Sequence, residues 1–213
     1  MTKMKVELVE FAGGDLSVVN SARVSFNKEV SEIEGGDKKL IKYLAKHKHM
    51  TPFRHNFIQL RCSVPLFLAR QLMKHQAGLT WNEVSRRYVD APPEFHQPTG
   101  WRTRPESGIK QGSGGVAEDT EQWAVTYGGY LESAQRLYSE MIKAGIAPEQ
   151  ARMVLPQSMM VDFIWSGNLL AFSHVYNLRI GEGAQVEAQE FATLLGGVVQ
   201  PVFPVSWDAL SKQ

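Results

Sequence analysis

Several features that mark other protein classes are scarce in this chain of 213 residues. It has 1 cysteine, Cys62, which permits neither an internal disulfide nor a cysteine-based zinc site. No apolar run reaches the ~18 residues of a membrane span, and the start MTKMKVELVEF has no apolar stretch of signal-peptide length. The net charge of +1 argues against a protein that coats nucleic acid. We therefore expect a cytoplasmic protein whose partners include neither membrane nor nucleic acid.

The rest of the composition is typical of one globular domain. Hydrophobic residues make up 43% of the chain and charged residues 21%, which excludes disorder as the main state. A chain of this length buries about 70% of its unfolded surface without a disulfide or a metal. Because no internal repeat or second composition class occurs, the sequence predicts a single α+β domain over residues 1–213.

Hydrophobic periodicity predicts both strands and helices. Strict alternation over 57–65 places Ile58, Leu60, Cys62 and Val64 on one buried face. Weaker alternation predicts strands at 4–11 and 159–165. Helical spacing predicts helices at 15–26, around 40–44, 66–75, 118–143, from 148 to a stop at Pro156, 168–179 and 184–199. The Pro- and Gly-rich segment 91–116 is predicted to be a long, mobile loop, and the tail 201–213 carries no predicted element.

Local signals refine these boundaries. Thr51 before Pro52 is predicted to cap a short helix or turn, and Asn168 is predicted to cap the helix that follows it. In the helix at 66–75, the buried stripe is predicted to include Leu72 and Met73. The apolar side chains from Trp123 to Met141 predict a long amphipathic helix that ends at Gly145.

The common catalytic motifs are absent: there is no P-loop, no G-x-G-x-x-G after a strand and no G-x-S-x-G. The glycines at 112, 114 and 115 indicate a flexible loop rather than a phosphate cradle. His47, His49 and His55 fit no strong metal-ligand spacing, so we expect no metal site. Cys62 falls on the apolar face of a predicted strand, which favours a buried structural thiol over a nucleophile.

Two clusters of polar residues remain as candidates for chemistry. Residues 70–88 hold four cations together with His75, Glu83 and Ser85. Arginine and lysine bind phosphate, and an amide such as Gln71 or Asn82 can pair with a base edge; a solvated helix end with a salt-bridged turn explains the same residues equally well. The second cluster runs from 152 to 179 and ends in Arg179, which a helix C-terminus alone would also favour.

These segments resemble the motifs of one family, the flavin-dependent thymidylate synthases (ThyX). Residues 70–88, RQLMKHQAGLTWNEVSRRY, are similar to its signature RHRxxSxNExSxRY. The segments ARVSF at 22–26, HMTPFRH at 49–55, ARMVLP at 151–156, and the residues Trp165, Asn168 and NLR at 177–179 resemble further family motifs, in the family's order. The chain departs from the pattern at Lys74-His75-Gln76, where the family has Arg-His-Arg, and at Arg54, where it has Glu.

The resemblance implies a ThyX-like fold, with a small, mostly antiparallel sheet flanked by helices. It implies an enzyme, a methyltransferase that reductively methylates dUMP to dTMP. Methylenetetrahydrofolate would supply the carbon, NADPH the electrons, and bound FAD would carry the hydride. The family also implies a homotetramer with active sites at subunit interfaces.

Residue roles follow from the same motif matches. Arg179 would be the catalytic residue, placed on the uracil ring to favour its ionised form. The residues expected to bind dUMP are Gln71, Lys74, Glu83, Ser85, Arg86, Arg87, Arg152 and Arg179. Those expected to line FAD are Ser25, His49, Thr51, Lys74, His75, Gln76, Glu83, Asn168, His174 and Leu178.

Two alternatives stay open at this point. One is a related flavoenzyme that acts on another pyrimidine nucleotide or transfers a hydroxymethyl group. The other, less favoured, is a nucleic-acid-binding module that uses Lys74, Arg86 and Arg87. Such a module predicts a steep salt dependence and no flavin colour.

Overall fold

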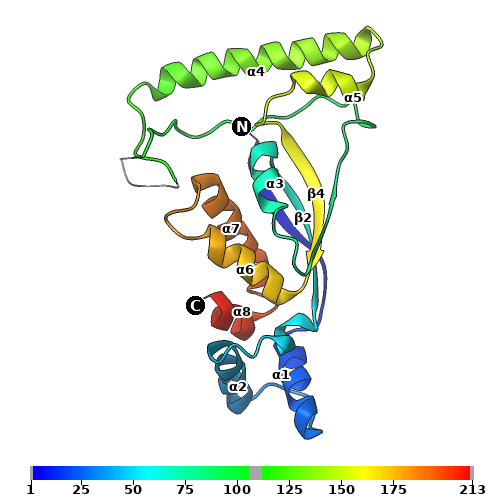
Figure 1. The fold of residues 1–213 in the computed structure, drawn as a ribbon, viewed down its shortest axis with the longest axis vertical. Helices are drawn as coiled ribbons and strands as arrows, with labels where there is room; N and C mark the ends of the chain where they lie inside the picture. The colour runs from blue at the N-terminus through cyan, green and yellow to red at the C-terminus, as the bar shows by residue number, and fades with distance from the viewer. Residues whose placement is uncertain (1, 106–111, 212–213) are drawn as a thin grey trace. The chain divides into compact units, whose positions relative to one another are not determined.

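The computed structural model describes residues 2–105 and 112–211 (Figure 1). Four strands form one antiparallel sheet: β1 (Lys5–Ala12), β2 (Phe57–Pro65), β3 (Leu79–Glu83) and β4 (Met160–Gly167), in the order β1-β2-β4-β3. In β2 the apolar residues Ile58, Leu60, Cys62 and Val64 are buried and alternate with more accessible polar ones, as expected for a strand with one face in the core. The α+β class and the small antiparallel sheet are therefore confirmed.

The described residues group into two compact units. Unit 1 comprises residues 2–4, 63–72, 82–105 and 112–163, and unit 2 comprises residues 5–62, 73–81 and 164–211. Strands β2, β3 and β4 each contribute residues to both units. The expectation of a single domain over 1–213 stays a prediction.

Unit 1 contains α3 (Leu66–Leu72), α4 (Thr120–Lys143), α5 (Pro148–Ala151) and the short helix η3 (Arg152–Val154). The long helix α4 packs against α5 and η3, and Gly145, with φ +82, ends it in the left-handed conformation. The predicted amphipathic helix is confirmed, but only Leu131, Ala134 and Tyr138 of α4 are buried. Four other large apolar side chains of α4, Trp123, Val125, Tyr130 and Leu137, are exposed.

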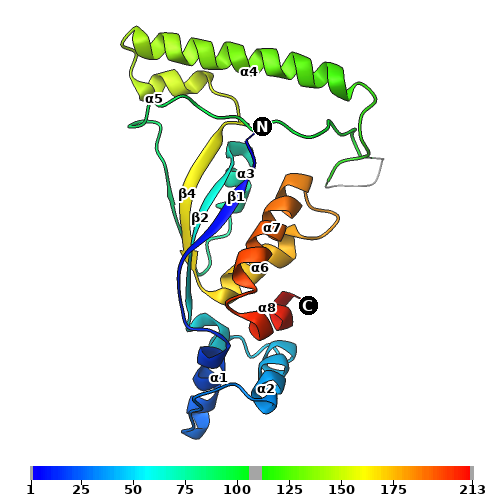
Figure 2. The same cartoon turned by 180° about the vertical axis from the view of Figure 1, so that it is seen from behind.

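Unit 2 contains α1 (Asp15–Arg23), η1 (Val24–Phe26), α2 (Gly35–Lys46), η2 (Thr51–Arg54), α6 (Leu169–Arg179), α7 (Val186–Val199) and α8 (Pro204–Ser211). Helix α7 packs against β1, α6 lies beside α7, and α8 packs against α2 (Figure 2). The buried Asp15 carboxylate accepts hydrogen bonds from the backbone N–H groups of Val205 and Ser206, both at 2.8 Å, and so caps the start of α8.

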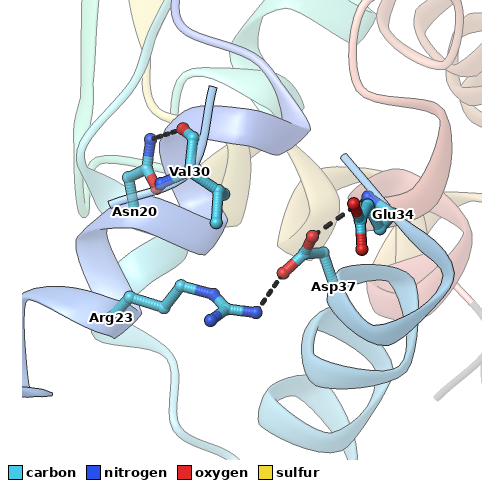
Figure 3. A network of polar contacts seen from close by, with 5 residues as sticks. All are labelled: Asn20, Arg23, Val30, Glu34 and Asp37. Carbon is cyan, nitrogen blue, oxygen red and sulfur yellow. Dashed lines mark hydrogen bonds and ion pairs between the residues drawn. The ribbon is translucent and has the colours of Figure 1, made fainter. Parts of the chain in front are cut away.

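A polar network fixes the segment that follows α1 (Figure 3). Asn20 Nδ2 donates to the Val30 carbonyl at 2.9 Å, and the Val30 N–H donates to Asn20 Oδ1 at 3.0 Å. The Arg23 guanidinium pairs with Asp37, which also accepts from the Glu34 N–H at 3.0 Å. The Glu34 N–H, and after it Arg23, lowers the pKa of the Asp37 carboxyl. The network therefore ties α1 to the start of α2.

Some local predictions were wrong. The helix at 66–75 ends at Leu72, so Met73 is 42% exposed instead of buried. Met50, not Thr51, is the N-cap of η2. Strand β3 and helix α8 were not predicted. The segment 91–116 is irregular where described, apart from the bridges Phe95–Met159 and Arg102–Val116, and residues 106–111 lie outside the described part. Within that part, no helix is long and apolar enough to cross a membrane.

Candidate functional site

A pocket of about 520 Å³ opens in unit 1 where β3 ends. The N–H of Val84 donates to the Asp162 carbonyl at 2.9 Å, so the chain stays beside β4 as it leaves β3. Polar side chains from this segment and from η3 line the pocket: Glu83, Ser85, Arg86, Arg87 and Arg152. Its apolar lining comes from Leu66, Val84, Met153, Leu155, Met159 and Val161. An apolar pocket with a few convergent charged groups is typical of a small-molecule site.

Two arginines of this pocket are suited to bind an anion. Arg87 is exposed, its Nε donates to Ser85 Oγ at 3.3 Å, and its guanidinium lies 5.0 Å from the centre of the Tyr88 ring. Arg152 is also exposed, and its Nε donates to the Glu149 carbonyl at 3.3 Å. Because a guanidinium carries five N–H donors, these single bonds leave donors for a phosphate.

Arg86 differs from both, because groups of the same unit already contact its guanidinium. Its Nη1 donates to the Ala91 carbonyl at 2.5 Å, and its guanidinium lies 5.7 Å from the ring centre of the buried Tyr138 on α4. A cation over an aromatic face is held more firmly where water is excluded. Arg86 therefore anchors the segment 84–91 to α4, a contact that the sequence did not indicate.

Gln71, on α3 in unit 1, offers an acceptor. Its side-chain oxygen Oε1 is buried and has no hydrogen-bond partner among the described residues. Such a buried carbonyl costs free energy unless a donor reaches it. The predicted role of Gln71 in ligand binding is consistent with this orphaned atom.

In unit 2 the turn after α3 packs on the start of α6. Gly78 has φ +75, and a Cβ there would lie only 2.8 Å from Asn168 Nδ2, so glycine is required both by the backbone and by the space. Asn168 Oδ1 accepts from the Ala171 N–H at 2.9 Å, which confirms the predicted helix cap. The turn is thereby held close to α6.

The side chains of His75 and Arg179 meet in unit 2. Arg179 Nε and Nη2 lie 3.2 and 3.1 Å from His75 Nε2. Burial lowers the pKa of His75, and the charges of Arg179 and His174 lower it further. Burial also lowers the pKa of Arg179, although a guanidinium stays protonated at any physiological pH.

The structure brings the predicted site residues together in two groups. Glu83, Ser85, Arg86, Arg87 and Arg152 share the pocket of unit 1, and His75, His174 and Arg179 interact in unit 2. The other predicted residues of unit 2 apart from Asn168 are exposed: Ser25, His49, Thr51, Lys74, Gln76 and Leu178. The described residues contain no group of three His, Cys, Asp or Glu side chains that could hold a metal ion.

Comparison with known proteins identifies the family. The family model Thy1, thymidylate synthase complementing protein, matches residues 7–205. The flavin-dependent thymidylate synthase of Kosmotoga olearia is 34% identical over 206 residues, which cover 96% of this chain and 88% of that protein. A protein of the same name from Thermus thermophilus is 32% identical over 207 residues, or 97% of this chain and 75% of that protein.

Solved structures agree with this assignment. The UMP/dUMP methylase PolB from Streptomyces cacaoi, bound with 5-Br dUMP, superposes with a TM-score of 0.88 at 30% identity and covers 99% of this chain and 96% of that one. Its complex with 5-Br UMP gives a TM-score of 0.87 at 28% identity, over 100% of this chain and 95% of that chain. The matched family model and the relatives together show that this chain belongs to the flavin-dependent thymidylate synthase family.

Proposed function

We propose that this chain is a methyltransferase that converts dUMP to dTMP with the help of a flavin. The observation that carries the proposal is the unit 1 pocket, in which Ser85, Arg87 and Arg152 come together from two family motifs. A nucleotide monophosphate presents a dianion that suits two guanidinium groups and a hydroxyl. In finer detail, we propose methylenetetrahydrofolate as carbon donor, NADPH as reductant and FAD as the flavin.

In a complex with dUMP, different residues would contact the phosphate and the uracil ring. Arg87, Ser85 and Arg152 bind the phosphate, while Arg86 holds their segment against Tyr138. The remaining members of the proposed dUMP set are Gln71, Lys74, Glu83 and Arg179. Arg179 stabilises negative charge on the uracil ring, because a fixed guanidinium with few surrounding waters favours the anionic form of the ring.

The donors of unit 2 fit a flavin dinucleotide. His75 and His174 place imidazole nitrogens near the turn that Gly78 packs on Asn168, and such nitrogens can form hydrogen bonds with the polar groups of FAD. The residues proposed to hold it are Ser25, His49, Thr51, Lys74, His75, Gln76, Glu83, Asn168, His174 and Leu178. When bound, the flavin supplies the hydride chemistry and the protein orients it.

We also propose a homotetramer with active sites at subunit interfaces. The exposed apolar side chains of α4, among them Trp123 at 55% and Val125 at 77%, support a partner surface on that helix. The exposure of most proposed flavin residues is consistent with a site that a second subunit completes.

The chemistry proposed needs no cysteine nucleophile, and Cys62 is unsuited to be one. It is 1% exposed, and burial raises the pKa of its thiol. We expect a Cys62→Ser protein to form dTMP at a rate within about threefold of wild type, with a lower melting temperature because a hydroxyl replaces sulfur in an apolar site. A folded Cys62→Ser protein without activity would restore a thiolate mechanism.

Loss of the phosphate contact should appear mainly in substrate affinity. Replacing Arg87 with alanine is expected to raise the KM for dUMP about 10- to 100-fold, since a charge-assisted hydrogen bond contributes about 1.5–3 kcal/mol. Steady-state kinetics against Arg136→Ala, an exposed arginine on α4, is the measurement. An unchanged KM in the Arg87→Ala protein would remove Arg87 from the phosphate site.

A product assay tests the proposed function directly. The purified protein is incubated with dUMP, methylenetetrahydrofolate, FAD and NADPH, and the nucleotide product is identified by mass spectrometry. We expect dTMP, and flavin absorbance that is released on denaturation. A protein that binds no flavin and leaves dUMP unchanged would refute the proposal.

A second candidate is methylation of UMP. Its support is the similarity to PolB, a UMP/dUMP methylase for which complexes with 5-Br dUMP and 5-Br UMP are both known. The same assay with dUMP, UMP and dCMP in competition separates the candidates, because the ratio of kcat/KM values measures the preference. Preference for UMP would make the ribonucleotide the substrate, and a product carrying a hydroxymethyl group would indicate the other alternative.

A further inference from the structure

The contact between His75 and Arg179 joins residues 104 positions apart within unit 2. Two nitrogens of one planar guanidinium, Nε and Nη2, approach a single atom, His75 Nε2, at 3.2 and 3.1 Å. Arginine has only donors, so Nε2 must be the unprotonated ring nitrogen, and the neutral ring carries its hydrogen on Nδ1. Because two contacts to one acceptor restrict rotation of the planar group, the orientation of the guanidinium is defined.

We propose that His75 is the positioning residue of Arg179: its Nε2 accepts from the guanidinium and sets the direction in which the remaining N–H groups of Arg179 meet the nucleotide. This inference rests on the proposed function, in which Arg179 faces the pyrimidine. It gives His75 a task that differs from lining the flavin, because that task acts through Arg179.

The surroundings of His75 keep it in the accepting form. From α6, Arg179 and His174 face it, and on its own segment the neighbouring Lys74 is another cation. Together with burial, the charges on α6 lower the pKa of His75, so the ring is neutral at pH 7. Protonation at low pH would place two positive charges about 3 Å apart and break the contact.

The position of residues 75–78 explains how His75 can hold the side chain of Arg179 in place. Three residues after His75, Gly78 packs on the Asn168 cap at the start of α6. Arg179 is the last residue of the same helix. The segment 75–78 thus contacts both ends of α6. A plain helix-dipole role for Arg179 would require neither contact.

A double-mutant cycle on the flavin-loaded protein tests the inference. The dissociation constant of dUMP is measured by calorimetry for wild type, His75→Ala, His75→Gln, Arg179→Ala and the double variant His75→Ala/Arg179→Ala. We expect His75→Ala to weaken binding about 10-fold, as for loss of one charge-assisted hydrogen bond. His75→Gln should recover most of that loss, because its amide oxygen replaces the Nε2 acceptor. The double variant should bind no more weakly than Arg179→Ala, because His75 acts only through Arg179.

Other results would overturn the inference. Wild-type affinity in His75→Ala, losses that multiply in the double variant, or a His75→Gln protein as weak as His75→Ala would each do so. Flavin content and melting temperature of every variant show whether lost flavin or lost fold explains a change. If His75→Ala does not fold, His75→Gln decides: its dUMP affinity should fall less on acidification than that of wild type, and an equal fall would refute the role. Wild-type protein that binds no dUMP would overturn the proposed function, and this inference with it.

Discussion

Replacing Arg179 with alanine is expected to lower kcat for dTMP formation about 100- to 1000-fold, the usual cost of removing one charge-stabilising donor from an active site. The side chain is partly buried, contacts His75 and belongs to the NLR motif at 177–179. The measurement is single-turnover product formation at saturating dUMP, with flavin content determined for each preparation. The fold should survive, because Arg179 ends α6 and its contact is with a single side chain.

Arg61→Ala provides the matched control for this experiment. Arg61 lies in unit 2 on β2 and is exposed, so its removal takes the same charge from the protein without touching His75. We expect near wild-type kcat for this control. A folded, flavin-loaded Arg179→Ala protein with unchanged kcat would show that another group stabilises the reacting pyrimidine.

The largest loss of stability is expected from Trp165→Ala. Trp165 is 0% exposed and lies against Trp81, Phe172 and Phe191, with ring centroids 5.4, 5.4 and 6.1 Å away. Truncating a buried tryptophan leaves a cavity that the neighbours fill only in part, which costs about 3–5 kcal/mol. Urea unfolding followed by circular dichroism measures the change in the free energy of unfolding.

A smaller change at the same position tests whether the cavity causes the loss of stability. Trp165→Phe keeps an aromatic ring against Trp81 and Phe172, so it should lose clearly less stability than Trp165→Ala. Equal losses in the two variants, or a loss below about 1 kcal/mol in Trp165→Ala, would contradict the role of Trp165 as the centre of this aromatic cluster.

Local patterns predicted the elements that depend on local residues. The alternation in β2 and the Asn168 cap of α6 are both readable from adjacent positions, and both are confirmed. Strand β3 has only five residues with a mixed burial pattern, and its pairing with β4 determines it. The N-terminus of α8 is capped by Asp15, which lies 190 positions before Val205. Such distant partners leave no local signal.

In the candidate site, too, local motifs were predictable and contacts between distant residues were not. The family motifs predicted binding residues among 83–87 and in η3, and five of these predicted residues line one pocket. The pairing of His75 with Arg179 and the stacking of Arg86 on Tyr138 connect residues 104 and 52 positions apart. Periodicity and spacing describe the faces of single elements, whereas contacts between distant elements depend on how the whole chain folds.

The carboxylate of Asp15 also constrains the order in which the protein can assemble during translation. Its two donors, the N–H groups of Val205 and Ser206, follow it by 190 and 191 positions and therefore leave the ribosome long after it. Until they emerge, burial of this charged group lacks its hydrogen bonds and is strongly unfavourable. Helix α1 therefore docks in its final place only after α8 has been synthesised.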